Sequence, residues 1–191
     1  MRLLLASTSP YRREMLQRLL SHFDCASPIC DETPETNEPP KTLAARLSVQ
    51  KAESLFEQHP NCWILGADQT ASIDGLLLGK PGHREAAISQ LMRASGQCAT
   101  FYSGLALVNS NTRVGMHTVV ETRVHFRRLD RPQIERYLDR EAPFDCAGSF
   151  KIEGLGISLF THIESEDPTA LIGLPLIQLT DYLNMAGFQV P

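Results

Sequence analysis

The alternation of apolar and polar residues divides the chain into short strands and helices that follow one another along its length. Apolar runs bounded by turn residues predict strands at 3–6, 63–66, 71–73, 76–78, 101–108 and 157–163, and a further strand returning to about 126. Helical spacing predicts helices at 12–20, 42–59, 84–95, 130–140 and 175–185, the second capped by Thr42. No repeat or linker interrupts the pattern, so we expect one mixed α/β domain over residues 1–191.

The first strand runs directly into the segment Ser7-Thr8-Ser9-Pro10-Tyr11-Arg12-Arg13. Pro10 is suited to a first helical turn, and Ser7 and Ser9 are candidate caps for that helix. Hydroxyls, free N–H groups and the guanidinium groups of Arg12 and Arg13 would together favour an oxyanion such as phosphate. An ordinary capped helix with a solvated arginine pair accounts equally well for this segment alone.

Asp68 and Lys51 stand at positions where a charge is unusual. Asp68 follows the apolar run 63–66 at its carboxyl end, where α/β proteins bind ligands, although an Asp there also caps turns. Lys51 lies on a helical stripe whose other members are leucines, so it points inward or extends its amine to the surface. An inward lysine requires an anionic partner.

Lys80 and Glu32 are further candidates. Lys80 lies between Gly79 and Pro81, after a hairpin predicted by Asp74-Gly75, and is either a fixed positive charge or a solvated one. Glu32 lies in an acidic stretch within the loop 27–41, which is an ordered loop or a mobile lid. With Asp68 it would supply hard oxygen ligands for magnesium, unless the stretch is simply solvated charge.

The sequence gives little support for a kinase-type nucleotide site or for a histidine metal site. The chain has no phosphate-binding Gly-rich motif of the kinase type, and its six histidines show no metal-binding spacing, which predicts surface or core roles for them. The acidic residues Glu164, Glu166 and Asp167 indicate a solvated turn.

Composition narrows the class of protein. A net charge of −4 argues against binding nucleic acid, so an anionic substrate would need a local basic pocket. Five cysteines without a C-x-x-C pair fit reduced thiols. The N-terminal apolar run is too short for a signal peptide or a membrane span. We therefore expect a soluble cytoplasmic protein with no membrane partner.

The ordered set of short motifs resembles the Maf family of nucleoside triphosphate pyrophosphatases over nearly the whole chain. These motifs are Ser7–Arg13, Asp31–Thr33, Lys51-Ala52, Gly66–Gln69, Gly79–Pro81, Tyr102–Gly104 and Ala147–Phe150. The resemblance implies an elongated α/β fold like that of the inosine triphosphate pyrophosphatases (Ham1), with flanking helices in two lobes around a cleft. It further implies a divalent metal (Mg, Mn or Co), often a homodimer, and hydrolysis between the α- and β-phosphates.

The resemblance also implies a role for each matching residue. Asp68 would be the general base, and with Glu32 it would hold the metal. Phosphate would be bound by the polar and basic residues Ser7, Arg12, Arg13, Lys51 and Lys80.

Three positions resemble the branch of the family that acts on 7-methyl-GTP. The branch that prefers dTTP and UTP typically carries Arg, Thr and Gln where this chain has Tyr11, Gln69 and Glu153. A cationic 7-methylguanine would stack on Tyr11 and bond to Glu153. The alternatives are a dTTP/UTP pyrophosphatase, or a nucleotide-binding regulator of cell division with little turnover.

Overall fold

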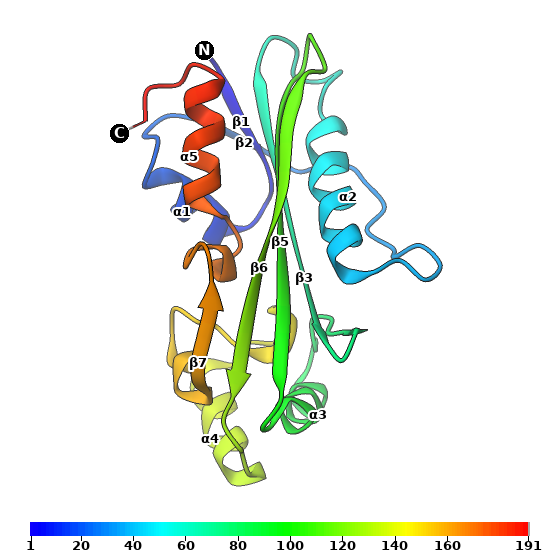
Figure 1. The fold of residues 1–191 in the computed structure, drawn as a ribbon, viewed down its shortest axis with the longest axis vertical. Coiled ribbons are helices and arrows are strands. Elements are labelled where there is room, and N and C mark those ends of the chain that lie inside the picture. Colours follow the sequence, from blue (N-terminus) through cyan, green and yellow to red (C-terminus); the bar gives the residue numbers. More distant parts are fainter. Residues whose placement is uncertain (191) are drawn as a thin grey trace. The chain divides into compact units, whose positions relative to one another are not determined.

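The computed structural model describes residues 1–190, in which strands and helices alternate as the sequence pattern predicts (Figure 1). The strands are β1 (Leu3–Ala6), β2 (Asp24–Ala26), β3 (Trp63–Ile73), β4 (Leu76–Leu77), β5 (Cys98–Asn109), β6 (Gly115–Phe126) and β7 (Phe160–Ser165). The α-helices are α1 (Pro10–Gln17), α2 (Pro40–Glu53), α3 (Arg84–Ala94), α4 (Arg131–Glu141) and α5 (Leu176–Met185). Short 3-10 helices are η1 (Ala147–Ser149), η2 (Leu155–Leu159) and η3 (Ala170–Ile172).

All the strands belong to one mixed sheet in the order β2-β1-β3-β5-β6-β7, with β4 paired to β3. β1 is parallel to both β2 and β3, and the register places Ala6 opposite Gly66. β7 is antiparallel to β6. The mixed α/β class expected from the sequence is therefore confirmed.

The chain forms two compact units by its internal contacts. Unit 1 comprises Met1–Gln69, Ser103–Val120 and Asp167–Pro191, and unit 2 comprises Thr70–Tyr102 and Glu121–Glu166. The single domain over 1–191 and the cleft between lobes stay predictions.

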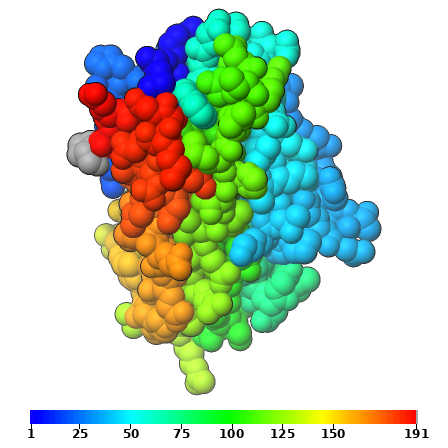
Figure 2. Space-filling model, turned by 45° about the horizontal axis from the view of Figure 1, so that its top comes forward, coloured from blue at the N-terminus to red at the C-terminus, as the bar shows by residue number. Residues whose placement is uncertain are grey.

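Unit 1 has a hydrophobic core on each face of its part of the sheet. Alternate residues of β1 point to opposite faces, so Leu3 and Leu5 enter one core while Leu4 and Ala6 enter the other. α1 and α5 cover the first core and α2 the second. Figure 2 shows α5, in red, beside the N-terminal residues, in blue. Helices on both faces explain why β1 is wholly apolar and buried.

Unit 2 has a core of phenylalanine rings contributed by strands and by the residue that follows η1. The ring of Phe150 packs edge-on against those of Phe101, Phe126 and Phe160, with centroids 4.7–5.9 Å apart. α3 packs against α4 and against η1. Within residues 1–190, no helix has both the length and the apolar character needed to cross a membrane.

Several local predictions are confirmed. The hairpin between β3 and β4 turns at Asp74 and Gly75, which both have positive φ, as a two-residue hairpin turn requires. α4 starts with a capping box in which Asp130 and Gln133 each bond the other's backbone N–H.

Several boundary predictions are wrong. α2 ends at Glu53 rather than at residue 59, and β7 begins at Phe160 rather than at residue 157, because η2 occupies 155–159. α2 starts at Pro40 rather than at a Thr42 cap, because proline at the first turn needs no N–H partner. Asp68 does not end its strand, because β3 continues to Ile73 after its parallel pairing with β1 stops at Gly66. β3 has β5 as its other neighbour in the sheet, and its last two residues also pair with β4.

Candidate functional site

A close contact between α2 and the sheet fixes the geometry of the candidate site in unit 1. A Cβ atom added to Gly66 on β3 would collide with the backbone carbonyl oxygen of Ser48, and one added to Gly104 on β5 would collide with that of Ala44. Only glycine therefore lets the helix backbone lie this near the two strands. The contact at Gly66 places the last turn of α2 beside the residues that follow on β3.

Lys51 and Asp68 form a buried ion pair at this contact. Lys51 Nζ donates to Asp68 Oδ1 at 2.6 Å, and the two side chains are 7% and 9% exposed. Lys51 Nζ also lies 2.9 Å from Glu32 Oε1, on a side chain that is 61% exposed. Lys51 thus points inward and has two anionic partners. The carboxylates of Glu32 and Asp68, proposed as metal ligands, both contact its ammonium nitrogen.

The loop that carries Glu32 is ordered by Arg46 of α2. The Arg46 guanidinium donates to both carboxylate oxygens of Glu38, each at 2.7 Å, and to the backbone carbonyl of Thr33 at 3.2 Å. These hydrogen bonds hold the pKa of the Glu38 carboxyl at about 2, below its ordinary value of 4.5. Of the two alternatives, an ordered loop or a mobile lid, these contacts favour the ordered loop. Arg46, which anchors it, was not among the residues identified from the sequence.

Arg12 adds a second positive charge near the two carboxylates. Its Nε donates to the carbonyl oxygen of Gly173 at 3.1 Å, which holds the guanidinium against the segment before α5. Burial lowers the pKa of Arg12, while the negative charges of Asp68 and Glu32 act in the opposite direction. Arg12 is half-buried, whereas Arg13 is exposed.

The start of α1 is capped from within. Ser9 is the N-cap, and its side chain accepts from the N–H of Arg12 while its carbonyl accepts from Arg13. The buried hydroxyl of Ser7 accepts from the N–H of Ser9 at 3.1 Å. The backbone N–H groups of Ser9, Arg12 and Arg13 therefore already donate within the protein, contrary to the expectation that free N–H groups would be present. The side-chain hydroxyl and guanidinium groups remain to bind an anion.

Gln69 has its side-chain nitrogen fully committed within unit 1. Nε2 lies 3.0 Å from Ser103 Oγ and 3.0 and 3.1 Å from the carbonyl oxygens of Ala170 and Leu171. Ser103 is buried, and its hydroxyl donates to the carbonyl of Ala170 at 2.7 Å. Because an amide nitrogen has two hydrogens, the carbonyl oxygen Oε1 is the part of Gln69 suited to a ligand, as an acceptor.

The segment between β7 and α5 was missed by sequence reasoning. Asp167 was assigned to a solvated turn, but it is fully buried and accepts from the N–H groups of Thr169 and Ile177. It thereby fixes the loop that presents the carbonyls of Ala170, Leu171 and Gly173 to Gln69 and Arg12. The bond to Thr169 is a local Asx turn. The bond to Ile177 reaches α5, and no local pattern in the sequence signals it.

The remaining predicted residues are divided between the units. Tyr11 is half-buried on the first turn of α1 in unit 1. Lys80 and Glu153 are exposed and belong to unit 2. The loop before Lys80 is held by Gln90, whose Nε2 donates to Gly79 O and whose Oε1 accepts from Ser149. The structure thus brings Ser7, Arg12, Glu32, Lys51, Asp68 and Gln69 into one unit.

Comparison with known proteins assigns the family. The chain matches the family described as Maf-like protein over residues 2–186, and it belongs to that family. It is 51% identical over 189 residues to a protein of Pseudomonas aeruginosa named 7-methyl-GTP pyrophosphatase, covering 99% of this chain and 98% of that protein. A Vibrio parahaemolyticus protein of the same name is 51% identical over 188 residues, covering 98% of this chain and 97% of its own.

The fold also matches a solved structure. The Staphylococcus aureus Ham1 protein superposes with a TM-score of 0.56 over 97% of this chain and 100% of its own, at 12% sequence identity. At that identity the match concerns the fold alone. It agrees with the Ham1-like fold expected from the sequence.

Proposed function

We propose that this protein is a nucleoside triphosphate pyrophosphatase that converts 7-methyl-GTP to 7-methyl-GMP and pyrophosphate. The observation that carries the proposal is the buried pair of Lys51 and Asp68 with Glu32 at the same ammonium nitrogen. Relatives about half identical over their full length bear the name of this activity.

Asp68 is the proposed general base. A water molecule attacks the α-phosphorus and gives its proton to the Asp68 carboxylate as the new P–O bond forms. The bond from the α-phosphorus to the bridging oxygen breaks, and that oxygen leaves with the electron pair as part of pyrophosphate. Lys51, bonded to Asp68 Oδ1 at 2.6 Å, holds the carboxylate in one orientation.

Positive charges bind the triphosphate in this proposal. Arg12, fixed by the carbonyl of Gly173, and Lys51 offset charge that develops on the leaving pyrophosphate. The Ser7 hydroxyl is suited to a phosphate oxygen. The exposed Arg13 and Lys80 are assigned to phosphate from the family resemblance.

A divalent cation fits the carboxylates of this site. Asp68 Oδ1 and Glu32 Oε1 both lie within 3 Å of the same nitrogen, so the two residues present hard oxygen donors to one small volume. They would hold Mg²⁺, Mn²⁺ or Co²⁺, which supplies charge neutralisation for the phosphates when bound. Two carboxylates are a common protein contribution to a magnesium site of this kind.

The purine base is assigned to Tyr11, Gln69 and Glu153. Gln69 offers only an acceptor, because its amide nitrogen bonds to protein. The N1–H and amino group of 7-methylguanine are donors, so Gln69 Oε1 and the Glu153 carboxylate match them. Tyr11 supplies an aromatic face for the cationic ring.

Cellular location and assembly are expectations of the same proposal. A nucleotide substrate and five free cysteines fit the cytoplasm. We further expect neither nucleic acid nor membrane as a partner, and a homodimer as in other members of the family.

A pyrophosphate-release assay over a nucleotide panel tests the function. With Mg²⁺ present, kcat/KM should be highest for 7-methyl-GTP, compared with GTP, dTTP and UTP. Preference for dTTP or UTP would contradict the base assignment. Thermal stabilisation by nucleotides without release of pyrophosphate from any of them would contradict catalysis and favour a binding protein that regulates cell division.

A further inference from the structure

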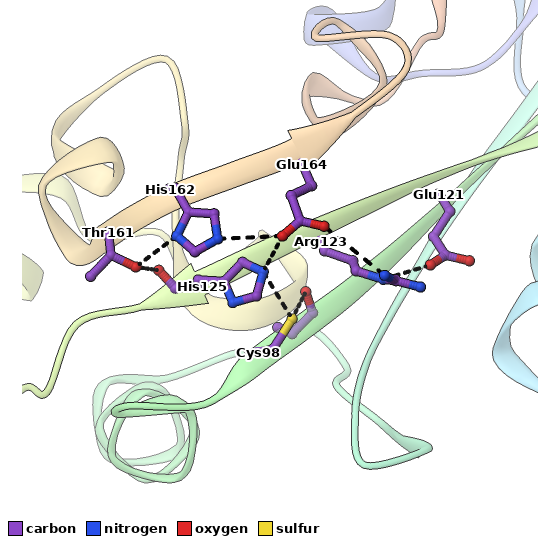
Figure 3. A network of polar contacts seen from close by, with 8 residues as sticks. Cys98, Glu121, Arg123, His125, Thr161, His162 and Glu164 are labelled. Carbon is purple, nitrogen blue, oxygen red and sulfur yellow. Dashed lines mark hydrogen bonds and ion pairs between the residues drawn. The ribbon is translucent and has the colours of Figure 1, made fainter.

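A second group of metal-ligand side chains lies in unit 2, on the paired strands β6 and β7 (Figure 3). The antiparallel register places His125 directly opposite His162. The two imidazole rings stack with centroids 3.9 Å apart and 11° between their planes. Both face Glu164, which lies two residues beyond His162 on β7. Because 37 residues separate the two histidines in sequence, local spacing could not reveal them.

The Nε2 atoms of His125 and His162 both lie close to the carboxylate oxygen Oε1 of Glu164. Glu164 Oε1 lies 3.1 Å from His125 Nε2 and 3.3 Å from His162 Nε2. Adjacent ligand atoms around tetrahedral Zn²⁺ are about 3.3 Å apart, given metal–ligand bonds of about 2.0–2.2 Å. The ligand atoms of all three residues lie within 4.8 Å of one another. A single cation beside Oε1 is therefore within reach of all three.

The hydrogen bonds of Thr161 select the metal-binding form of His162. The Thr161 hydroxyl donates its one hydrogen to the backbone carbonyl of His125 at 3.1 Å. Its oxygen lies 3.3 Å from His162 Nδ1, which must then be the donor of that contact. In neutral His162 the hydrogen is thus on Nδ1, and Nε2 directs a lone pair towards the Glu164 carboxylate. Two acceptors that face each other need a proton or a metal cation between them.

Two neighbouring side chains contact the group. Cys98 Sγ lies 3.7 Å from His125 Nε2, but Cys98 is not among the residues whose ligand atoms all lie within 4.8 Å of one another. Arg123 contacts the other carboxylate oxygen, Glu164 Oε2, at 4.0 Å, which leaves Oε1 directed at the histidines.

We propose that His125, His162 and Glu164 form a Zn²⁺ site that joins β7 to β6, with its fourth position open to water. Imidazole donors suit zinc rather than magnesium, so this site differs in its metal from the carboxylates of unit 1. The side chain of His162 is 56% exposed, so an ion can enter from solvent. As β7 is the edge strand of the sheet, the metal would stabilise its pairing.

Zinc titration of the full-length chain tests the proposal. In excess Mg²⁺, which occupies carboxylate sites, wild type should compete with a chromophoric chelator for one equivalent of Zn²⁺. His162→Gln should weaken this binding by at least about 100-fold, more than the loss of an outer partner costs. The control His117→Gln removes an exposed histidine of β6, the strand that carries His125, outside the group and should bind as wild type does. Equal affinity in His162→Gln, or no zinc binding by wild type, would overturn the proposal.

Co²⁺ provides a spectroscopic readout of the ligand set. Wild type should give visible absorption bands on binding Co²⁺, and His125→Gln should lose these bands while keeping its metal-free melting temperature. Unchanged Co²⁺ bands in His125→Gln would contradict the assignment of His125 as a ligand.

Discussion

Lys51 Nζ lies 2.6 Å from Asp68 Oδ1 and also binds Glu32, so one ammonium group joins a buried strand to a surface loop. The Lys51–Asp68 pair is shielded from water, with less than a tenth of either side chain exposed. Removing one partner of such a pair leaves an uncompensated buried charge, which costs more than the pair itself contributes. Lys51 therefore has a structural role as well as the proposed chemical one.

Replacing Lys51 by Met should lower the free energy of unfolding by about 3–5 kcal/mol at neutral pH. The lower end is expected, because Arg12 still compensates part of the Asp68 charge. Urea unfolding of the variant measures the loss. Lys41→Met, which removes an exposed lysine from the same helix, is the control and should change stability by less than about 0.5 kcal/mol. Equal losses in the two variants would show that the pair is not buried in solution.

Gly66→Ala should destabilise the protein by about 1–3 kcal/mol or more, because the new Cβ meets the backbone of α2 rather than a flexible side chain. Displacement of α2 would also move Lys51 away from Asp68, so pyrophosphate release should fall with stability. In Gly79→Ala an added Cβ meets nothing within 4 Å, and its unfolding free energy should match wild type. A stable, fully active Gly66→Ala would contradict the close contact.

The Glu38 carboxyl should titrate with a pKa of about 2, which NMR can follow through its side-chain resonances. Because folding depresses this pKa from 4.5, the pair with Arg46 stabilises the folded protein fully above pH 4.5. That contribution is lost as the pH falls towards about 2. Arg46→Met should return the pKa towards 4.5 and release the loop, whereas Arg113→Met, which removes an exposed arginine, should not. An unchanged Glu38 pKa in Arg46→Met would exclude Arg46 as the cause.

Changing Tyr11→Arg, Gln69→Thr and Glu153→Gln together should shift preference from 7-methyl-GTP towards dTTP or UTP. The variant loses a stacking face and a charged acceptor, which together should change discrimination by about 2–4 kcal/mol. This corresponds to roughly 30- to 1,000-fold in the ratio of kcat/KM values. An unchanged ratio would mean that the base is recognised elsewhere, and an equal loss on every nucleotide would assign these residues to folding or catalysis.

Much of the fold followed from local patterns in the sequence. The Asp74-Gly75 hairpin and the capped start of α4 depend on residues close in sequence, so turn and capping preferences suffice to predict them. The three-residue strand β2 has no such pattern, because two of its three residues are exposed and pairing with β1 alone defines it. β3 passes Asp68 for a similar reason, because it continues beside β5 and its end also pairs with β4.

The candidate site was predictable only in part. A lysine that points inward from a stripe of leucines requires an anionic partner. For the inward orientation of Lys51, this rule correctly predicted an acidic partner. Ser103, Asp167 and the His125–His162 pair were missed, because their roles arise from contacts made across the sheet or across loops. Such contacts depend on strand register, which one sequence does not specify.

The Asp68→Asn variant, assayed with 7-methyl-GTP and Mg²⁺, tests the central claim most directly. Lys51 keeps Glu32 as a partner in this variant, so circular dichroism and the melting temperature should show a folded protein. Because the carboxamide does not accept the proton of the attacking water, pyrophosphate release should fall by at least about 100-fold. Binding of a non-hydrolysable analogue, measured by calorimetry, should change only a few-fold. Near-normal turnover by a folded Asp68→Asn protein would contradict the account and transfer the role of base to Glu32.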